Sequence, residues 1–262
     1  VWALQVGLSH PNLVAIQECF ALPDARYGVR MELYHGHELF DWCGQLPLVV
    51  LHHTGRGLGR ALQYLHGHDL VHRDCKPENV LLRIRAECKL LDLGSMRPVG
   101  RRSSVQGTLP YMAPEARALF GGEHLPVPAL DVWGLACTFC MALAGDIVRD
   151  REHALKQRLN SSEAVVVLNH MAGALVAERE RPPLAPLLAW LEQQQAAPLH
   201  QNTAIVHGPL RHKQVLMMRR AQAPRLVVRV PQDHARPKCP NHERNVTNGV
   251  KCGAADSEQR PV

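Results

Sequence analysis

The chain has 262 residues and a mass of 29.2 kDa, enough for one large domain or two smaller ones. Apolar residues make up 46% and charged residues 21%, which excludes a wholly disordered, collagen-like or disulfide-dense secreted chain. No apolar run reaches the roughly 18 residues that a membrane-spanning helix needs. The eight cysteines follow no framework spacing, which favours a reducing compartment, the cytoplasm or the nucleus.

The net charge of +6 comes from the end of the chain. From Pro198 onward there are eleven basic and four acidic residues, a difference of +7, so the preceding part is nearly neutral. Frequent prolines and weak periodicity predict that the tail 199–262 is mostly disordered. The basic segment 212–220 has an apolar centre and could form a helix for a partner. A nucleic-acid or membrane-surface arm is the other interpretation, but the tail has no aromatic side chain on which bases could stack.

Short apolar runs predict strands early in the chain, and apolar spacings of three to four predict helices later. Pro23-Asp24 is expected to form the turn between the first two strands. Leu51, Leu58, Leu62 and Leu65 share one face of the first expected helix, which runs toward His66. The other expected elements are strands at 13–20, 27–33, 80–85 and 88–91, a buried helix at 127–145, and helices at 152–178 and 184–196.

The segment Gly55-Arg56-Gly57-Leu58-Gly59 has the composition of a phosphate-binding loop. It does not follow a strand-like run, however, and it lies within the first expected helix. Three interior glycines cost a helix about 3 kcal/mol relative to alanines, and the sequence shows no reason for them. We nevertheless expect a helix here rather than a phosphate site.

Three other patterns resemble sites and are interpreted otherwise. Cys137 and Cys140 form a C-x-x-C pair, but they lie inside the apolar segment 127–145 and are expected to be small core side chains. Cys239, His242 and Cys252 lack a regularly spaced fourth ligand, so no zinc site is expected. The glycosylation sequon Asn245-Val246-Thr247 has no meaning in a cytoplasmic protein.

The most informative stretch is Val71-His72-Arg73-Asp74-Cys75-Lys76-Pro77-Glu78-Asn79. It is followed in order by Asp92-Leu93-Gly94, Gly107-Thr108 and Ala113-Pro114-Glu115. Each motif alone is weak, but the ordered set is not expected by chance. Such a set suits phosphoryl transfer, in which the terminal phosphate is held in line with an acceptor hydroxyl while metal neutralises its charge.

Each polar side chain in these motifs has a chemical use in that reaction. Asn79 and Asp92 can supply, from two adjacent loops, the hard oxygen ligands that Mg²⁺ prefers. Asp74 can orient the acceptor hydroxyl and take its proton. Lys76 places a positive charge beside the moving phosphate.

From Val1 to Leu191 the sequence resembles the protein kinase superfamily. The resemblance implies an α+β, protein kinase-like fold with a helical carboxyl lobe and a remnant of the antiparallel sheet of the small lobe. It makes Asp74 the catalytic base and Lys76 the mark of the serine/threonine type. It also makes Asn79 and Asp92 the Mg²⁺ ligands.

Further positions take their roles from the same resemblance. Leu93 replaces the usual Phe of the metal-binding triplet and leaves the ligand intact. Asp131 begins the central buried helix of the family and would brace the catalytic loop. Arg181 would pair with Glu115, which ends the segment that docks the substrate.

The resemblance also implies a nucleotide wall upstream of the catalytic loop. Met31 would be the gatekeeper of the hinge, and the backbones of Glu32 and Tyr34 would meet adenine. Glu38 falls where family members contact the ribose, and Leu81 falls where they form the floor of the adenine pocket. The expected cofactors are therefore ATP and Mg²⁺.

The loop after Asp92 contains candidate regulatory sites. Arg101-Arg102-Ser103-Ser104 lies between the metal triplet and Ala113-Pro114-Glu115. In kinases a phosphate at such a position can pair with the arginine of the catalytic loop, here Arg73, and order the loop. An ordinary flexible basic loop is the alternative.

The kinase pattern also requires a Gly-rich loop over the phosphates and a lysine on the third strand, and neither is in this sequence. Counting back from His10, the glutamate that pairs with that lysine would lie just before Val1. We therefore expect a fragment that is inactive alone. Its expected parts are a remnant of the small lobe and hinge at 1–37, the carboxyl lobe at 38–198 and the tail at 199–262.

The expected function of the parent protein is ATP-dependent phosphorylation of Ser or Thr in protein substrates. The alternative is a non-catalytic pseudokinase scaffold, in which the lobe and the basic tail recruit a partner. Met96-Arg97-Pro98 and the run His10-Pro11-Asn12-Leu13-Val14 resemble details of the Src-homology-3-binding kinases.

Overall fold

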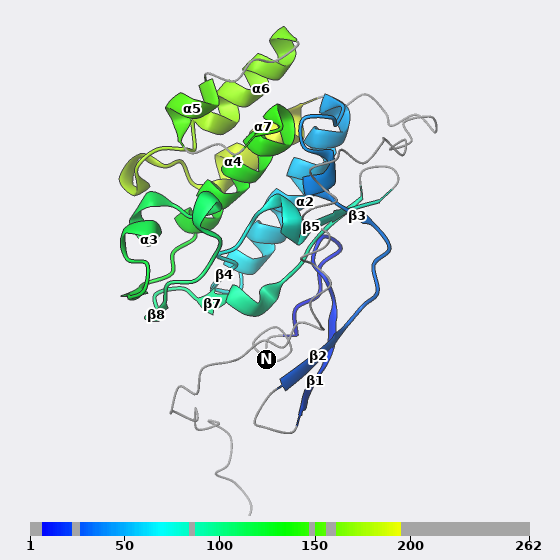
Figure 1. Cartoon of the computed structure of the whole chain (residues 1–262), viewed down its shortest axis with the longest axis vertical. Coiled ribbons are helices and arrows are strands. Elements are labelled where there is room, and N and C mark those ends of the chain that lie inside the picture. Colours follow the sequence, from blue (N-terminus) through cyan, green and yellow to red (C-terminus); the bar gives the residue numbers. More distant parts are fainter. Residues whose placement is uncertain (1–6, 23–26, 84–86, 147–149, 156–160, 195–262) are drawn as a thin grey trace, which may run out of the picture. The chain divides into compact units, whose positions relative to one another are not determined.

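The computed structural model describes residues 7–22, 27–83, 87–146, 150–155 and 161–194. These residues form a mixed α+β fold of helices and small antiparallel sheets, as expected (Figure 1). None of the described helices is long and apolar enough to cross a membrane. The predictions for the tail, including the segment 212–220, the sequon and the Cys239, His242 and Cys252 set, lie outside the described residues.

The first sheet is a hairpin of β1 (Ile16–Ala21) and β2 (Tyr27–Met31), which confirms two antiparallel strands near the predicted positions. The prediction that the first strand begins at Leu13 is wrong. Leu13 forms a bridge with Leu90, and the Val14 amide donates to the Leu90 carbonyl at 3.0 Å. The segment before β1 is therefore held by the carboxyl part of the fold.

Three further small sheets lie around the catalytic loop. Apart from the neighbouring strands β5 and β6, these sheets pair segments that are distant in the sequence, so they fix loops rather than build a core layer. One sheet has the order β3 (His37–Glu38), β5 (Val80–Leu82) and β6 (Cys88–Leu90). The others pair β4 (Leu70–Val71) with β7 (Arg97–Pro98), and β8 (Ser103–Ser104) with β9 (Glu123–His124).

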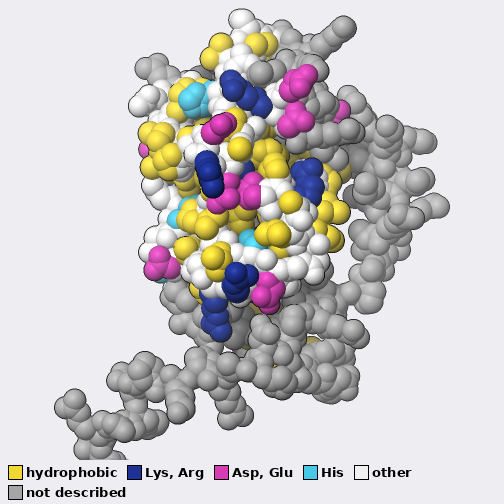
Figure 2. Space-filling view, turned by 90° about the vertical axis from the view of Figure 1, so that its left-hand side faces the viewer, with side chains coloured by type: hydrophobic (Ala, Val, Ile, Leu, Met, Phe, Trp, Pro, Cys, Tyr) yellow, Lys and Arg dark blue, Asp and Glu magenta, His cyan; other side chains and the backbone are white. Residues whose placement is uncertain are grey.

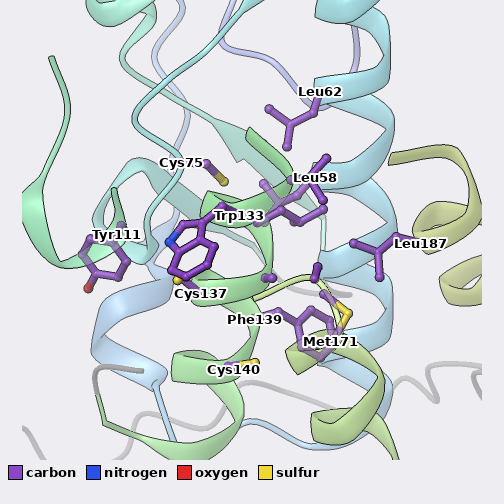
Figure 3. Close-up of a cluster of buried hydrophobic side chains, with 14 of the residues drawn as sticks. Leu58, Leu62, Cys75, Tyr111, Trp133, Cys137, Phe139, Cys140, Met171 and Leu187 are labelled. Carbon is purple, nitrogen blue, oxygen red and sulfur yellow. The ribbon is translucent and has the colours of Figure 1, made fainter. Parts of the chain in front are cut away.

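The core lies between four helices: α2 (Leu48–His66), α4 (Ala129–Ala144), α6 (Ser162–Ala172) and α7 (Leu184–Gln193). Helix α4 is buried along nearly its whole length, as its predominantly apolar sequence predicts. Figure 3 shows side chains of these helices converging, among them Leu58, Phe139, Met171 and Leu187. Short elements complete the chain: α3 (Pro114–Ala118), α5 (Arg151–Leu155), and single 3-10 turns at Leu39–Trp42, Pro77–Asn79, Leu93–Ser95, Leu109–Tyr111 and Glu178–Glu180.

The single helix predicted at 152–178 is wrong, because this stretch contains two helices, α5 and α6. Ser161 lies in extended backbone, and its hydroxyl accepts a hydrogen bond from the Ala164 amide at 3.1 Å. This N-cap starts a new helix, which ends before Gly173. Apolar periodicity continues on both sides of the break and therefore does not reveal it.

Cys137 and Cys140 are core side chains, as expected: both are buried in α4, and neither forms a disulfide with another described residue. Burial raises the pKa of the Cys137 thiol to about 12, so it stays protonated near neutral pH. Among the described residues, no group of three or more His, Cys, Asp or Glu side chains could hold a metal ion.

The glycine-rich segment is helical and forms the middle of α2, which confirms the prediction. The structure also supplies the missing reason for its glycines. A Cβ atom on Gly55 would lie 2.5 Å from the ring of Phe139, and one on Gly57 would lie 2.5 Å from Cys88 Sγ. A Cβ on Gly59 would lie 2.9 Å from Leu188 Cδ1. The glycines thus allow α2 to approach its neighbours closely.

Replacing Gly55 by alanine is therefore expected to destabilise the fold by about 1–3 kcal/mol, although alanine gains about 1 kcal/mol in helix propensity. The stiff Phe139 ring has to move to admit the methyl group. Gly59→Ala is the matched control, because the end of the flexible Leu188 side chain can turn away. Urea unfolding measures both variants, and an equal or higher stability for Gly55→Ala would contradict the close-packing explanation.

Candidate active site

The backbone of the catalytic loop is held in place by the carboxylate of Asp131. Asp131, in the first turn of α4, is 1% exposed. Its Oδ1 accepts from the Arg73 amide at 2.7 Å, and its Oδ2 accepts from the His72 amide at 2.8 Å. His66 Nε2 lies 2.9 Å from the same Oδ2. Burial opposes ionisation of Asp131, but these hydrogen bonds and the nearby histidines lower its pKa overall. The predicted brace is confirmed.

His72 connects the catalytic loop to the strand that leads to Asp92. Its side chain is fully buried, and its Nε2 lies 2.9 Å from the Leu91 carbonyl. Its Nδ1 accepts from the Asp74 amide at 3.3 Å. With Nδ1 as the acceptor, Nε2 is the nitrogen that donates to the Leu91 carbonyl. The ring therefore positions the Asp74 backbone between the catalytic loop and the strand that leads to Asp92.

Both oxygens of the Asp74 carboxylate are held in place. Oδ1 accepts from the Thr108 amide at 2.8 Å, and Oδ2 accepts from Asn79 Nδ2 at 3.1 Å. Lys76 Nζ lies 3.2 Å from the same Oδ2 and also donates to Thr108 Oγ1. The side chain is only 8% exposed. The fold thus brings together three predicted site residues, Asp74, Lys76 and Asn79.

Thr108 is a site residue that the sequence analysis missed. Gly107-Thr108 belongs to the ordered motif set but received no role of its own, whereas Thr108 contacts both Asp74 and Lys76. The approach depends on Gly107, which has φ of +132° and whose Cβ, if present, would lie 2.8 Å from the Arg73 carbonyl. The Gly107-Thr108 pair was the only signal in the sequence for a site residue here. Its position does not reveal that the Thr108 amide contacts Asp74, 34 residues earlier in the chain.

The two expected metal ligands lie on neighbouring segments, since the Leu91 amide donates to the Asn79 carbonyl at 2.8 Å. Asn79 Nδ2 donates to the Asp74 carbonyl at 2.8 Å as well as to Oδ2, which leaves its Oδ1 as the acceptor atom. Asp92 has left-handed backbone, with φ of 51°, and its Oδ1 accepts from the Gly94 amide. A non-glycine residue held in this region is typical of functional sites. One amide and one carboxylate oxygen fit Mg²⁺, which keeps several waters.

The predicted nucleotide-wall residues come from the end of β2, from the segment that follows it and from the β3–β5 ladder. Glu38 and Leu81 are directly opposite each other in the β3–β5 ladder, so the fold brings these two together. Met31 ends β2 and is 47% exposed. The guanidinium carbon of Arg83 lies 5.0 Å from the centre of the Tyr34 ring. Partial burial raises the pKa of the Tyr34 phenol.

Glu32 makes contacts that the sequence did not reveal. Its carboxylate forms an ion pair with Lys89 of β6 at 2.5 Å and accepts from the Ala15 amide at 2.7 Å. Its own amide donates to the Ala15 carbonyl at 2.9 Å, and Lys89 Nζ also donates to the Leu13 carbonyl at 3.1 Å. Burial opposes ionisation of Glu32, but Lys89 and the Ala15 amide lower its pKa overall. Lys89 thus fastens Glu32 to β6.

The predicted pair of Arg181 and Glu115 is confirmed. Arg181 Nη1 and Nη2 donate to the two carboxylate oxygens of Glu115 at 2.7 and 3.1 Å. The same guanidinium donates to the Ala129 and Val176 carbonyls, and it lies 5.0 Å from the centre of the Trp133 ring. This pair joins the Ala113-Pro114-Glu115 segment to the helical core.

Comparison with known proteins agrees with this geometry. The protein kinase domain family matches residues 3–191, and the chain therefore belongs to that family. The chain is 33% identical over 147 residues to myosin light chain kinase A of Dictyostelium discoideum, which covers 53% of this chain and 48% of the relative. It is 32% identical over 160 residues to mouse serine/threonine-protein kinase SIK1, which covers 58% and 20%. It is 34% identical over 154 residues to serine/threonine-protein kinase chk-2 of Caenorhabditis elegans, which covers 53% and 31%.

The matched part of this chain spans less than half the length of these curated relatives. Members of this family are phosphotransferases, and their kinase domains typically use ATP and Mg²⁺.

Proposed function

We propose that this chain is part of a protein kinase that transfers the terminal phosphate of ATP to Ser or Thr residues of proteins. The observation that carries the proposal is the Asp74 carboxylate, which is held between the Thr108 amide and the Lys76 ammonium. A carboxylate oriented in this way can accept the proton of a hydroxyl that replaces one of these contacts. The relatives named above are serine/threonine kinases or a myosin light chain kinase, which supports the same class of reaction.

Each remaining site residue has a role in this proposal. Asp74 is the base, and Lys76 neutralises charge near the transferred phosphate. Asn79 Oδ1 and the Asp92 carboxylate would hold Mg²⁺, which neutralises the phosphate oxygens when bound. Thr108 positions Asp74 and Lys76 relative to each other.

On the nucleotide side, five residues are proposed to line the site. Glu38 would accept hydrogen bonds from the ribose, and Leu81 would pack against the adenine. The hinge would contribute the backbones of Glu32 and Tyr34, with Met31 as gatekeeper. The finer resemblance to the Src-homology-3-binding kinases, and the division of the chain at 37 and 198, stay predictions.

The test is Asp74→Asn in the complete protein. Because asparagine keeps the shape but cannot accept a proton, phosphate transfer to a protein substrate should fall by about 10²–10⁴-fold. Binding of Mg²⁺-ATP, measured as a thermal shift, should persist. Asp69→Asn is the matched control, because Asp69 is exposed in the same region of the chain and has a left-handed backbone that asparagine tolerates.

Two outcomes would contradict the proposal. Undiminished turnover in Asp74→Asn would remove Asp74 as the base. Absence of any thermal shift with Mg²⁺-ATP in the unaltered protein, together with absence of turnover, would favour the non-catalytic scaffold.

A further inference from the structure

Lys89 of β6 has a largely buried side chain, which is uncommon for a lysine. Figure 2 faces the side where α3 and β8 lie in Figure 1, and there the basic side chains lie at the surface, among acidic and apolar ones. The side chain of Lys89, by contrast, is 14% exposed. Its Nζ donates to the Glu32 carboxylate at 2.5 Å and to the Leu13 carbonyl at 3.1 Å. The ammonium group is thus enclosed between β6 and the segments on both sides of the β1–β2 hairpin.

Lys89 contacts both residues whose backbones are proposed to meet adenine. Besides forming the ion pair with Glu32, its Nζ lies 5.5 Å from the centre of the Tyr34 ring, within the range of a cation–π contact. The side chains of Glu32 and Tyr34 therefore lie toward the same ammonium group, whereas Leu33 between them is 80% exposed. One cation thus holds both ends of the segment 32–34.

Lys89 also belongs to the row of residues proposed for the floor of the nucleotide site. In the β3–β5–β6 sheet, Glu38 is opposite Leu81, and Leu81 is opposite Lys89. Opposite residues of antiparallel strands project to the same face, so these three side chains share one face of the sheet. Leu82 and Leu90, the next residues along β5 and β6, are fully buried on the other face. Lys89 therefore joins the segment 32–34 to the face that carries the proposed ribose and adenine contacts.

The hydrogen-bonding edge of adenine makes the position of this segment important. The 6-amino group is a donor and N1 is an acceptor, so a carbonyl and an amide of one extended segment can bind both. Such bonds need donor–acceptor distances of about 2.7–3.2 Å. A shift of the segment 32–34 by about 1 Å relative to Leu81 would therefore weaken both bonds, even if the segment kept its own conformation.

We propose that Lys89 is a positioning residue of the nucleotide site, which holds the backbone of the segment 32–34 at the distance from Leu81 that adenine requires. This inference rests on the proposed function and deepens it. The contacts between adenine and the backbone belong to that function, and the role of Lys89 is new. Lys89 does not touch the nucleotide in this arrangement and acts through Glu32 and Tyr34.

The first experiment compares Lys89→Met with the unaltered complete protein in phosphate transfer to a protein substrate. Methionine keeps much of the length and packing of the side chain but removes the charge. The KM for Mg²⁺-ATP should rise by about 10-fold or more, whereas kcat should change by less than about 3-fold, because contacts to the base are the same before and during transfer.

Arg83→Met is the matched control for this measurement. Arg83 also lies against the Tyr34 ring, 5.0 Å from its centre, but its ion pair is with the exposed Glu87. The KM for Mg²⁺-ATP in Arg83→Met should therefore stay within about 2-fold of the unaltered value. An equal rise of KM in both variants would overturn the role assigned to the ion pair of Lys89 with Glu32.

The second experiment measures nucleoside binding by isothermal titration calorimetry and needs no turnover. Inosine has a carbonyl and an N1–H where adenosine has the 6-amino group and N1, so its donor and acceptor are exchanged. The unaltered protein should bind adenosine about 10-fold or more tightly than inosine. This ratio should fall toward one in Lys89→Met. In Lys89→Arg, whose guanidinium can still pair with Glu32, the ratio should be largely restored.

An unchanged ratio in Lys89→Met would overturn the proposal even if the thermal midpoint fell, because a lysine that serves only stability does not alter the choice of base. If Lys89→Met does not fold, Lys89→Gln is measured instead. Its neutral amide can still donate to Glu32, and an unchanged ratio there would equally overturn the proposal. Absence of adenosine binding to the unaltered protein would refute the proposed function itself, whereas equal binding by Lys89→Met and the unaltered protein would refute the role of Lys89 alone.

Discussion

Replacing Asp131 by alanine is expected to lower the free energy of unfolding by about 3–5 kcal/mol. The substitution leaves the amides of His72 and Arg73 buried without their acceptor, and His66 loses its partner as well. Each buried donor without a partner costs about 1–3 kcal/mol. The catalytic loop should therefore loosen even where the rest of the fold survives.

Asp131→Asn gives an intermediate test. The asparagine side chain has one oxygen, so it can replace only one of the two carboxylate oxygens that accept from the His72 and Arg73 amides. We expect Asp131→Asn to destabilise the fold by about 1–3 kcal/mol, because the NH₂ group of the asparagine side chain would face a hydrogen-bond donor and leave it without an acceptor. Urea unfolding measures both variants, and Asp69→Asn, an exposed change, is the control. A loss below 1 kcal/mol for Asp131→Ala would show that the brace does not hold the loop.

Replacing Arg181 by methionine is expected to destabilise the fold by a similar amount, about 3–5 kcal/mol. The Arg181 side chain in this pair is fully buried, whereas Glu115 is 25% exposed. Methionine fills much of the volume but leaves the Glu115 carboxylate and the Ala129 and Val176 carbonyls without their donor. It also removes the cation from the face of the Trp133 ring.

The chain offers a matched control for this prediction. Arg60 and Glu192 form an ion pair of nearly the same length, 2.9 Å, but with 55% and 43% of their side chains exposed. Exposed pairs contribute about 0–1 kcal/mol, so Arg60→Met should have little effect on urea unfolding. Equal losses for Arg181→Met and Arg60→Met would contradict the role assigned to burial.

The parts of this fold that follow from the sequence are those with local signals. The apolar run of α4 and the leucine spacing of α2 identify both helices, and α2 confirms the helical interpretation of Gly55–Gly59. The sequence also predicted that Asp131 braces the catalytic loop and that Arg181 pairs with Glu115, because the order of the motifs identifies the family.

The parts that the sequence missed are contacts between distant segments. Nothing near Thr108 shows that its amide meets Asp74, and nothing near Lys89 shows that it pairs with Glu32. The separate start of α6 after Ser161 was missed because apolar residues are spaced as in a helix on both sides of it. Such features depend on how loops are brought together after the helices pack, which no local pattern records.

The contacts around Glu32 have a consequence for motion. Ala15 and Glu32 exchange two hydrogen bonds at the base of the β1–β2 hairpin, and Lys89 ties this base to β6. These contacts couple the base of the hairpin to β6. Any bending of β1 and β2 relative to β6 is therefore expected to begin beyond Ala15 and Glu32, within the strands themselves.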